Sequence, residues 1–164
     1  MVSLPSAFPG SRRAGWTTAI LVAGVAVGTL DLVFACSFWG LGYGVPPLRI
    51  LHSIAAGVLG PAASESGWPG AALGVACHYF IATCMAAAYA LGAIGMPRLV
   101  QRPIAFGLAY GLALYAFMTW VVVPLSNAPP ARAMPLAWTL SSIAMHALIG
   151  VLCAGLARIG LRGR

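Results

Sequence analysis

The amino-acid sequence predicts an all-α polytopic membrane protein with four transmembrane helices and one short external helix. Composition gives the first reason, since 61% of the 164 residues are hydrophobic and only 7% are charged, whereas a soluble domain carries about 25% charged residues. The second reason is that the apolar residues form four blocks, roughly 16–39, 71–95, 103–124 and 135–157. Each block is near the ~20 residues with which a helix crosses a bilayer.

Charge placement is the third observation. All nine cations are arginines, which give a net charge of +7, and most stand at the ends of the apolar blocks, where they can contact lipid head groups. Seven lie on one side: Arg12, Arg13, Arg98, Arg102, Arg158, Arg162 and Arg164. Only Arg49 and Arg132 lie on the other side. The positive-inside rule therefore places both termini in the cytoplasm, and the lipid bilayer, not a nucleic acid, is the expected partner.

Residues 1–15 are predicted to be a cytoplasmic tail, and residues 16–157 the transmembrane domain. Ser11-Arg12-Arg13 before an apolar run also resembles a twin-arginine signal. We favour an uncleaved first span, because the run is longer than a signal core and contains Asp31. Within it, Gly24 and Gly28 form a small-xxx-small step that allows close helix packing, and Asp31 lies on the same face. The carboxylate should point into the bundle.

A short helix over about 47–60 should follow, because Pro46-Pro47 favours a helix start and apolar residues then recur at helical spacing. It is too short to span, so we expect it on the outer surface or capping the bundle. Arg49 and His52 lie on its more polar side. The main interpretation of His52 is a solvated or head-group-facing residue, and gating of the bundle by Arg49 and His52 is the alternative.

Spans two to four also combine small residues at intervals of four with a polar residue on the same face. His78 lies on the smaller-residue face of the second span. In the third, Gly107, Gly111 and Tyr115 recur at intervals of four, and His146 and Gly150 do so in the fourth. The two hairpins could thus be an internal repeat with His78 and His146 in matching positions. Residues 158–164 are predicted to be a basic cytoplasmic tail.

One polar residue per span falls at a similar depth. Counting inward at about 1.5 Å per residue puts Asp31, His78, Tyr115 and His146 about 12–16 Å from the outer boundary. A lone carboxylate in a bilayer costs at least ~3 kcal/mol, so it should be neutralised or find a partner. We therefore expect these four residues to converge in one polar layer.

The layer has several possible roles. It could be a structural hydrogen-bond layer that fixes helix register, or a site for a proton, an ion or a small ligand. A third possibility is b-type haem bound by His78 and His146, and a metal held by two His and one Asp is a fourth. No cofactor is the main expectation. Phosphate-loop, nucleophile-elbow and HExxH patterns are missing from the sequence, so an enzyme is the less favoured class.

The last three spans resemble the YagU-type bacterial inner-membrane proteins. The resemblance lies in His78 with downstream Tyr89, in Gly107 and Gly111 leading to Pro124-Leu125 and Pro129, and in Pro135 with Trp138 and His146. It implies a multipass bacterial inner-membrane protein without an assigned reaction. The predicted function is therefore an intramembrane polar site, with a haem-carrying electron-transfer subunit and a structural subunit of a larger membrane complex as alternatives. A homo-oligomer formed through the glycine faces is also expected.

Overall fold

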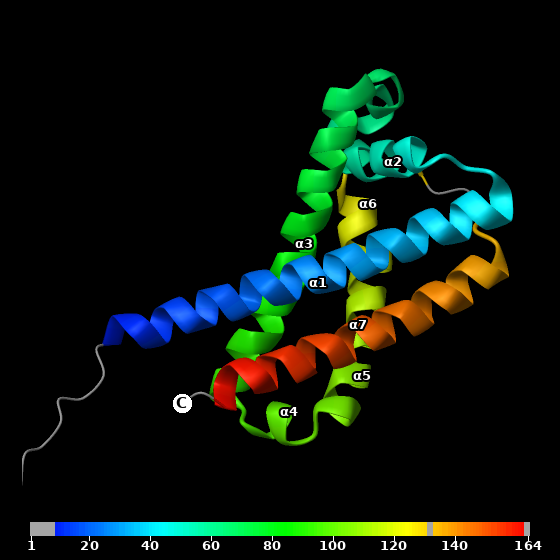
Figure 1. Ribbon diagram of the computed structural model, residues 1–164. Helices are drawn as coiled ribbons and strands as arrows, with labels where there is room; N and C mark the ends of the chain where they lie inside the picture. Colours follow the sequence, from blue (N-terminus) through cyan, green and yellow to red (C-terminus); the bar gives the residue numbers. More distant parts are fainter. Residues whose placement is uncertain (1–8, 131–132, 163–164) are drawn as a thin grey trace, which may run out of the picture.

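The computed structural model describes residues 9–130 and 133–162, and the side chains of 16–130 and 133–161. Every element in these ranges is helical (Figure 1). In chain order the elements are α1 (Pro9–Tyr43), α2 (Pro47–Leu59), the 3₁₀ helix η1 (Gly60–Glu65), α3 (Gly67–Gly95), α4 (Arg98–Gln101), α5 (Pro103–Phe117), the π-helix η2 (Met118–Val122), α6 (Val123–Leu125) and α7 (Leu136–Arg162).

Four segments are long and apolar enough to cross a membrane: Trp16–Tyr43, Gly67–Gly95, Pro103–Leu125 and Leu136–Leu161. They coincide with the four predicted blocks, which indicates a helical membrane protein. Four boundaries lie several residues outside the prediction. The helix α1 spans Pro9–Tyr43 instead of 16–39, α3 begins at Gly67 instead of 71, and α7 runs to Arg162 past the predicted limit of 157. Helical hydrogen bonding continues past the apolar limit because it does not depend on side-chain polarity. Residues 1–8, 131–132 and 163–164 lie outside the described chain, and with them the predicted positions of Arg132 and Arg164.

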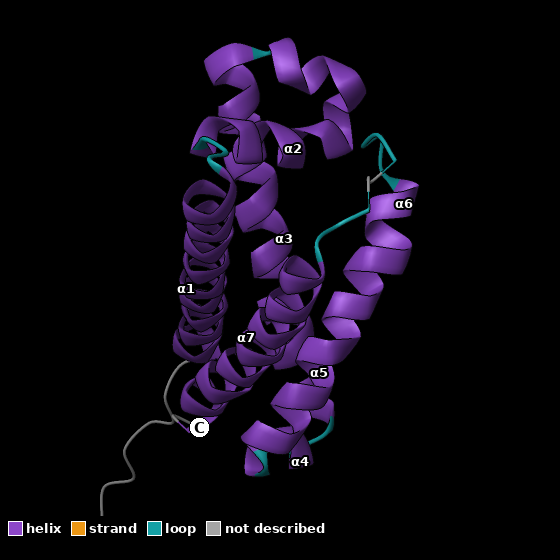
Figure 2. Ribbon diagram, turned by 90° about the vertical axis from the view of Figure 1, so that its right-hand side faces the viewer, coloured by secondary structure: helices purple, strands orange, loops and turns teal. Residues whose placement is uncertain are grey.

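The helix α7 occupies the middle of the bundle and contacts α1, α3 and α5 (Figures 1 and 2). It runs antiparallel to α1, since Trp138 near its start stacks on Phe34 and Gly160 near its end approaches Ala19. At one end α2 and η1 lie across the bundle, and at the opposite end α4 joins α3 to α5 (Figure 2). The orientation of these ends to a membrane stays a prediction.

Glycines bring α5 and α7 into backbone contact. A Cβ added to Gly107 would lie 2.6 Å from the Val151 Cα, and one added to Gly111 would lie 2.7 Å from the Ala147 Cα. Gly150 faces them in return, because its Cβ would lie 2.7 Å from the Gly111 Cα. No real Cβ fits at such distances, so the close approach requires glycine at these positions.

The helices α1 and α3 also meet at a glycine pair, but against side chains. A Cβ on Gly24 would lie 2.7 Å from the Cα of Thr83 and 2.9 Å from its Cβ, and one on Gly28 would lie 3.0 Å from the Tyr79 ring and 3.1 Å from the Ala82 Cβ. The two hairpins therefore share a glycine-faced first helix that packs on a histidine-bearing second helix.

Tyrosines join α3 to α5 near the α4 end of the bundle. The Tyr110 hydroxyl donates to the Met85 carbonyl at 2.7 Å, and the Tyr89 hydroxyl donates to the Leu99 carbonyl at 2.9 Å. The two rings meet edge to face with centroids 5.0 Å apart. Around them lies the main buried cluster, which includes Ala86, Ala90, Cys153, Ala154 and Ala157.

The helix of the third span widens into a π turn before Pro124. Val123 donates its backbone N–H to the Met118 carbonyl, which is five residues earlier instead of four. Proline has no N–H and its ring crowds the preceding turn, so a π turn just ahead of it relieves a helix that would otherwise break. The sequence predicted the end of this span at residue 124 but did not indicate that the helix changes from α to π hydrogen bonding before it.

Two hydrogen-bonded contacts hold α2 across the bundle. At one of them His52 is buried, with 9% of its surface exposed, and its Nε2 donates to the Gly67 carbonyl at 2.8 Å. The expectation of a solvated or head-group-facing His52 is therefore wrong, because the imidazole is buried and bonds to the first residue of α3. At the other contact Asn127 donates its backbone N–H to the Gly57 carbonyl and its side-chain amide to the Val58 carbonyl, at 3.0 and 2.9 Å.

Candidate functional site: a cavity beneath α2

A cavity of about 600 Å³ lies under α2, between α1, α3, η2 and α7. Most of its lining is aliphatic, aromatic or methionine side chains. Its principal polar groups are Asp31, Arg49, Ser53, His78, Ser142 and His146. Three of the four residues predicted to share a polar layer therefore face one space, and they come from three different helices.

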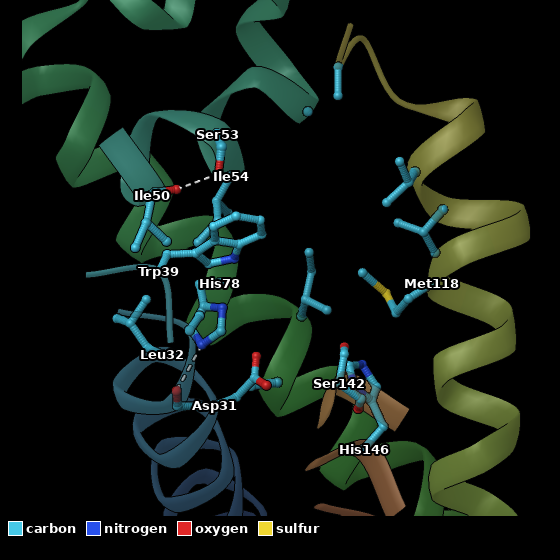
Figure 3. Close-up of a pocket in the computed structure, with 18 of the residues that line it drawn as sticks. Asp31, Leu32, Trp39, Ile50, Ser53, Ile54, His78, Met118, Ser142 and His146 are labelled. Atoms are coloured by element: carbon cyan, nitrogen blue, oxygen red, sulfur yellow. Dashed lines mark hydrogen bonds between the residues drawn. The ribbon is translucent and has the colours of Figure 1, made fainter. Parts of the chain in front are cut away.

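Asp31 is the only acidic residue in the four candidate spans, because the other acid, Glu65, lies in η1. Gly28 stands one turn before it in α1, and both residues line the cavity. The carboxylate points into the space between α1 and η2 (Figure 3). No hydrogen bond or ion pair joins it to a residue of the described chain. A half-buried carboxylate thus meets the cavity without a protein partner.

His78 reaches the cavity from α3. Its Nε2 lies 2.8 Å from the Gly28 carbonyl of α1. A carbonyl oxygen only accepts, so this nitrogen carries the hydrogen, and the neutral ring then has its lone pair on Nδ1. The bond also fixes the imidazole against the glycine step of α1, beside Asp31 (Figure 3).

His146 enters from α7 and bonds within its own helix. Its Nδ1 lies 2.9 Å from the Ser142 carbonyl, so Nδ1 carries the hydrogen and Nε2 of the neutral ring is an acceptor. The Tyr115 ring packs edge to face on this imidazole, with centroids 5.5 Å apart. Tyr115 itself is not part of the cavity lining, so it lies beside His146 and supports its ring.

Both imidazoles are close enough to Asp31 to interact with its charge. The inner end of the cavity therefore combines one carboxylate with two imidazoles whose N–H groups are already bonded to backbone carbonyls. Such a set can accept hydrogen bonds, exchange protons or balance a positive charge.

Two tryptophans form an aromatic part of the wall. Trp39 of α1 and Trp138 of α7 line the cavity, and their rings pack with centroids 5.1 Å apart. Phe34 stacks on Trp138 and Phe38 packs edge to face on it, at 5.6 and 5.1 Å. No feature of the sequence indicated that these two tryptophans would share a cavity.

The opposite end of the cavity belongs to α2. Ile50, Ser53 and Ile54 line it there, away from Asp31 and His146 (Figure 3), and Arg49 of the same helix is also part of the lining. Of the two residues predicted to gate the layer, Arg49 lines the cavity and His52 does not. Met118 and Val122 of η2 also line it, and sequence reasoning missed both because the π turn changes which residues face inward.

A metal held by two His and one Asp has little support in the geometry. Among the described residues, no group of three or more His, Cys, Asp or Glu side chains could hold a metal ion. Haem on His78 and His146 stays a prediction. As an iron ligand, His78 would have to give up its Nε2 bond to Gly28 or bind through Nδ1.

Comparison of the chain with protein-family models, with curated proteins and with solved structures finds no match. The resemblance of the last three spans to YagU-type proteins therefore stays a prediction from the sequence.

Proposed function

We propose that this protein binds a small molecule inside the membrane, in the cavity beneath α2, with Asp31 as the charged anchor. His78 and His146 flank the bound molecule and take part through hydrogen bonds or protons. One observation carries the proposal: the sole carboxylate of the four spans faces a cavity that it shares with both imidazoles, and no described residue pairs with it.

The cost of an intramembrane carboxylate supports this function. An ionisable group in a bilayer is expensive and is normally paired with another group or used in function. A carboxylate that served only helix register should bond to a neighbouring helix, as His78 bonds to Gly28. Asp31 instead faces space that a ligand can enter.

The size of the cavity favours a molecule over a bare ion. Small-molecule sites typically have volumes of about 300–1,000 Å³ and mostly apolar walls with a few polar groups. The volume here is about 600 Å³ and the walls are mainly apolar. A proton can still move with the ligand, since carboxylate and imidazole groups line the same space.

We place the protein in a bacterial inner membrane, with the α4 end in the cytoplasm and α2 on the outer side. The arginines support the orientation, because Arg98, Arg102 and Arg158 belong to the end that holds α4 and the end of α7. The YagU-type resemblance supports the type of membrane.

A cavity-filling substitution tests the function. Ala35 lines the cavity, whereas Val33 on the same helix is 57% exposed on the outer face of the bundle. We expect at least one biphenyl-bearing probe to bind the purified protein in detergent, as measured by calorimetry against protein-free micelles. The probes are 4-phenylbenzylamine, its N-trimethyl analogue, 4-phenylbenzyl alcohol and biphenyl-4-carboxylate.

Ala35→Phe should abolish this binding and the control Val33→Phe should keep it, while both variants stay folded. If none of the probes binds, or if binding survives Ala35→Phe, the proposed function is wrong. The polar layer would then be the structural element that the sequence offered as an alternative.

A further inference from the structure

The three ionisable groups at the inner end of the cavity offer hydrogen-bond acceptors to a ligand. The Asp31 carboxylate, in the ionised form that a bound cation favours, only accepts. His78 donates its N–H to the Gly28 carbonyl and His146 donates its N–H to the Ser142 carbonyl, at 2.8 and 2.9 Å. The remaining nitrogen of each neutral ring is therefore an acceptor. Donors of the lining include the Ser142 hydroxyl and the indole N–H groups of Trp39 and Trp138.

The charges of the lining also favour a cationic ligand. When ionised, Asp31 gives the inner end a negative charge, and the only cation of the described lining, Arg49, comes from α2 and forms no ion pair with it. A ligand with a second negative group would meet repulsion from the ionised Asp31 carboxylate. A neutral acceptor such as a carbonyl would leave the acceptors of the site unpaired, which is costly in a low-dielectric space.

The rest of the cavity fits an apolar body. Aliphatic side chains and the methionines Met85 and Met118 line the space between α3 and η2, and Trp39 and Trp138 line the side formed by α1 and α7. Flexible methionines adapt to differing apolar shapes, and tryptophan faces attract cations and aromatic rings.

We infer that the ligand of this cavity is an apolar or aromatic molecule bearing a protonated primary or secondary amine. Its ammonium group binds Asp31 and donates to His78 Nδ1 and His146 Nε2, while its apolar body fills the space toward α2. This inference rests on the proposed binding function and names the chemical class of the ligand.

Four probes with one biphenyl body separate charge from hydrogen-bond donation. 4-Phenylbenzylamine carries both, the N-trimethyl analogue carries charge without a donor, 4-phenylbenzyl alcohol carries a donor without charge, and biphenyl-4-carboxylate carries the opposite charge. In the native protein we expect the amine to bind about tenfold or more tightly than the alcohol and the carboxylate. The trimethylammonium probe should fall between the amine and the alcohol.

Variants identify the groups involved. Asp31→Asn should weaken amine binding about tenfold or more and change alcohol binding little. His78→Ala and His146→Ala should each weaken the amine several-fold and leave the trimethylammonium probe nearly unchanged, since that probe donates no hydrogen bond.

The outcomes separate this inference from the function on which it rests. Equal or tighter binding of the alcohol or the carboxylate in the native protein, lost in Ala35→Phe, overturns the amine inference and leaves a ligand site. Equal binding of the amine and trimethylammonium probes overturns the donor role of the ammonium. Lack of binding by all four probes overturns the inference together with the proposed function. The native-protein comparison decides these cases even where a variant fails to fold.

Discussion

The half of the bundle next to α4 and the half beneath α2 use the same helices in opposite ways. In the first, which we term the closed half, small side chains such as Ala86, Ala90 and Ala154 are buried with Tyr89 and the helices pack tightly. In the second, the cavity half, the same helices surround a space of about 600 Å³. The boundary lies near Ala82 and Ile149, which belong to both the buried cluster and the cavity wall.

The polar groups differ in the same way. In the closed half the Tyr89 and Tyr110 hydroxyls both donate to backbone carbonyls. In the cavity half the Asp31 carboxylate has no partner among the described residues. Since unpaired polar groups oppose folding and paired ones support it, the comparison assigns stability mainly to the closed half and binding to the cavity half.

The largest expected effect is in the closed half, at the contact between α5 and α7. Gly150→Ala should lower the free energy of unfolding by about 3 kcal/mol, because the new Cβ would overlap the backbone of Gly107 and Gly111. Gly155→Ala is the matched control on the same helix, since nothing lies within 4 Å of its added Cβ. Reversible unfolding in mixed micelles measures both, and equal stability of the two variants would contradict the tight contact.

The next effect has the opposite sign and lies in the cavity half. Asp31→Asn should keep or raise the free energy of unfolding, by up to about 2 kcal/mol, because it removes an unpaired charge from a membrane-embedded site. Glu65→Gln, at the exposed other acid in η1, should change little. A marked loss of stability in Asp31→Asn would show that the carboxylate holds the fold together and would erase the difference between the halves.

The Tyr110 hydrogen bond of the closed half should have a smaller effect. Tyr110→Phe removes the bond from α5 to the Met85 carbonyl and should lower the free energy of unfolding by about 1 kcal/mol. Tyr43→Phe, on an exposed ring at the end of α1, serves as the control. If both variants unfold alike, the tyrosine does not join α3 to α5 in the way described.

The smallest effect concerns α2, the helix that lies over the cavity half. Asn127→Ala removes the amide bond to the Val58 carbonyl at the end of α2 and should lower global stability by only about 0.5 kcal/mol, because the site is exposed. Amide hydrogen exchange in α2 should nevertheless become faster. Ser64→Ala removes a bond local to η1 and should leave α2 exchange unchanged. If amide hydrogen exchange in α2 is unaltered in Asn127→Ala, this contact does not hold α2 in place over the cavity.

By itself the sequence determined the helices. Blocks of apolar residues about 20 long permit one stable secondary structure in a bilayer, because the backbone groups must be paired within each segment. Glycines at intervals of four likewise indicated the contact faces, since only small residues allow backbones to approach closely. The common depth of Asp31, His78 and His146 followed from counting residues along helices of known rise.

Only the tertiary structure decided what those residues face. Depth along a helix does not fix direction around it, so sequence reasoning could not separate Tyr115, which lies behind His146, from the three residues in the cavity wall. The π turn before Pro124 brought in Met118 and Val122 through a change of register that apolar periodicity does not reveal. His52 became buried because its partner, the Gly67 carbonyl, lies on another helix. Each of these outcomes depends on how separate helices pack, and that information is spread over the whole chain.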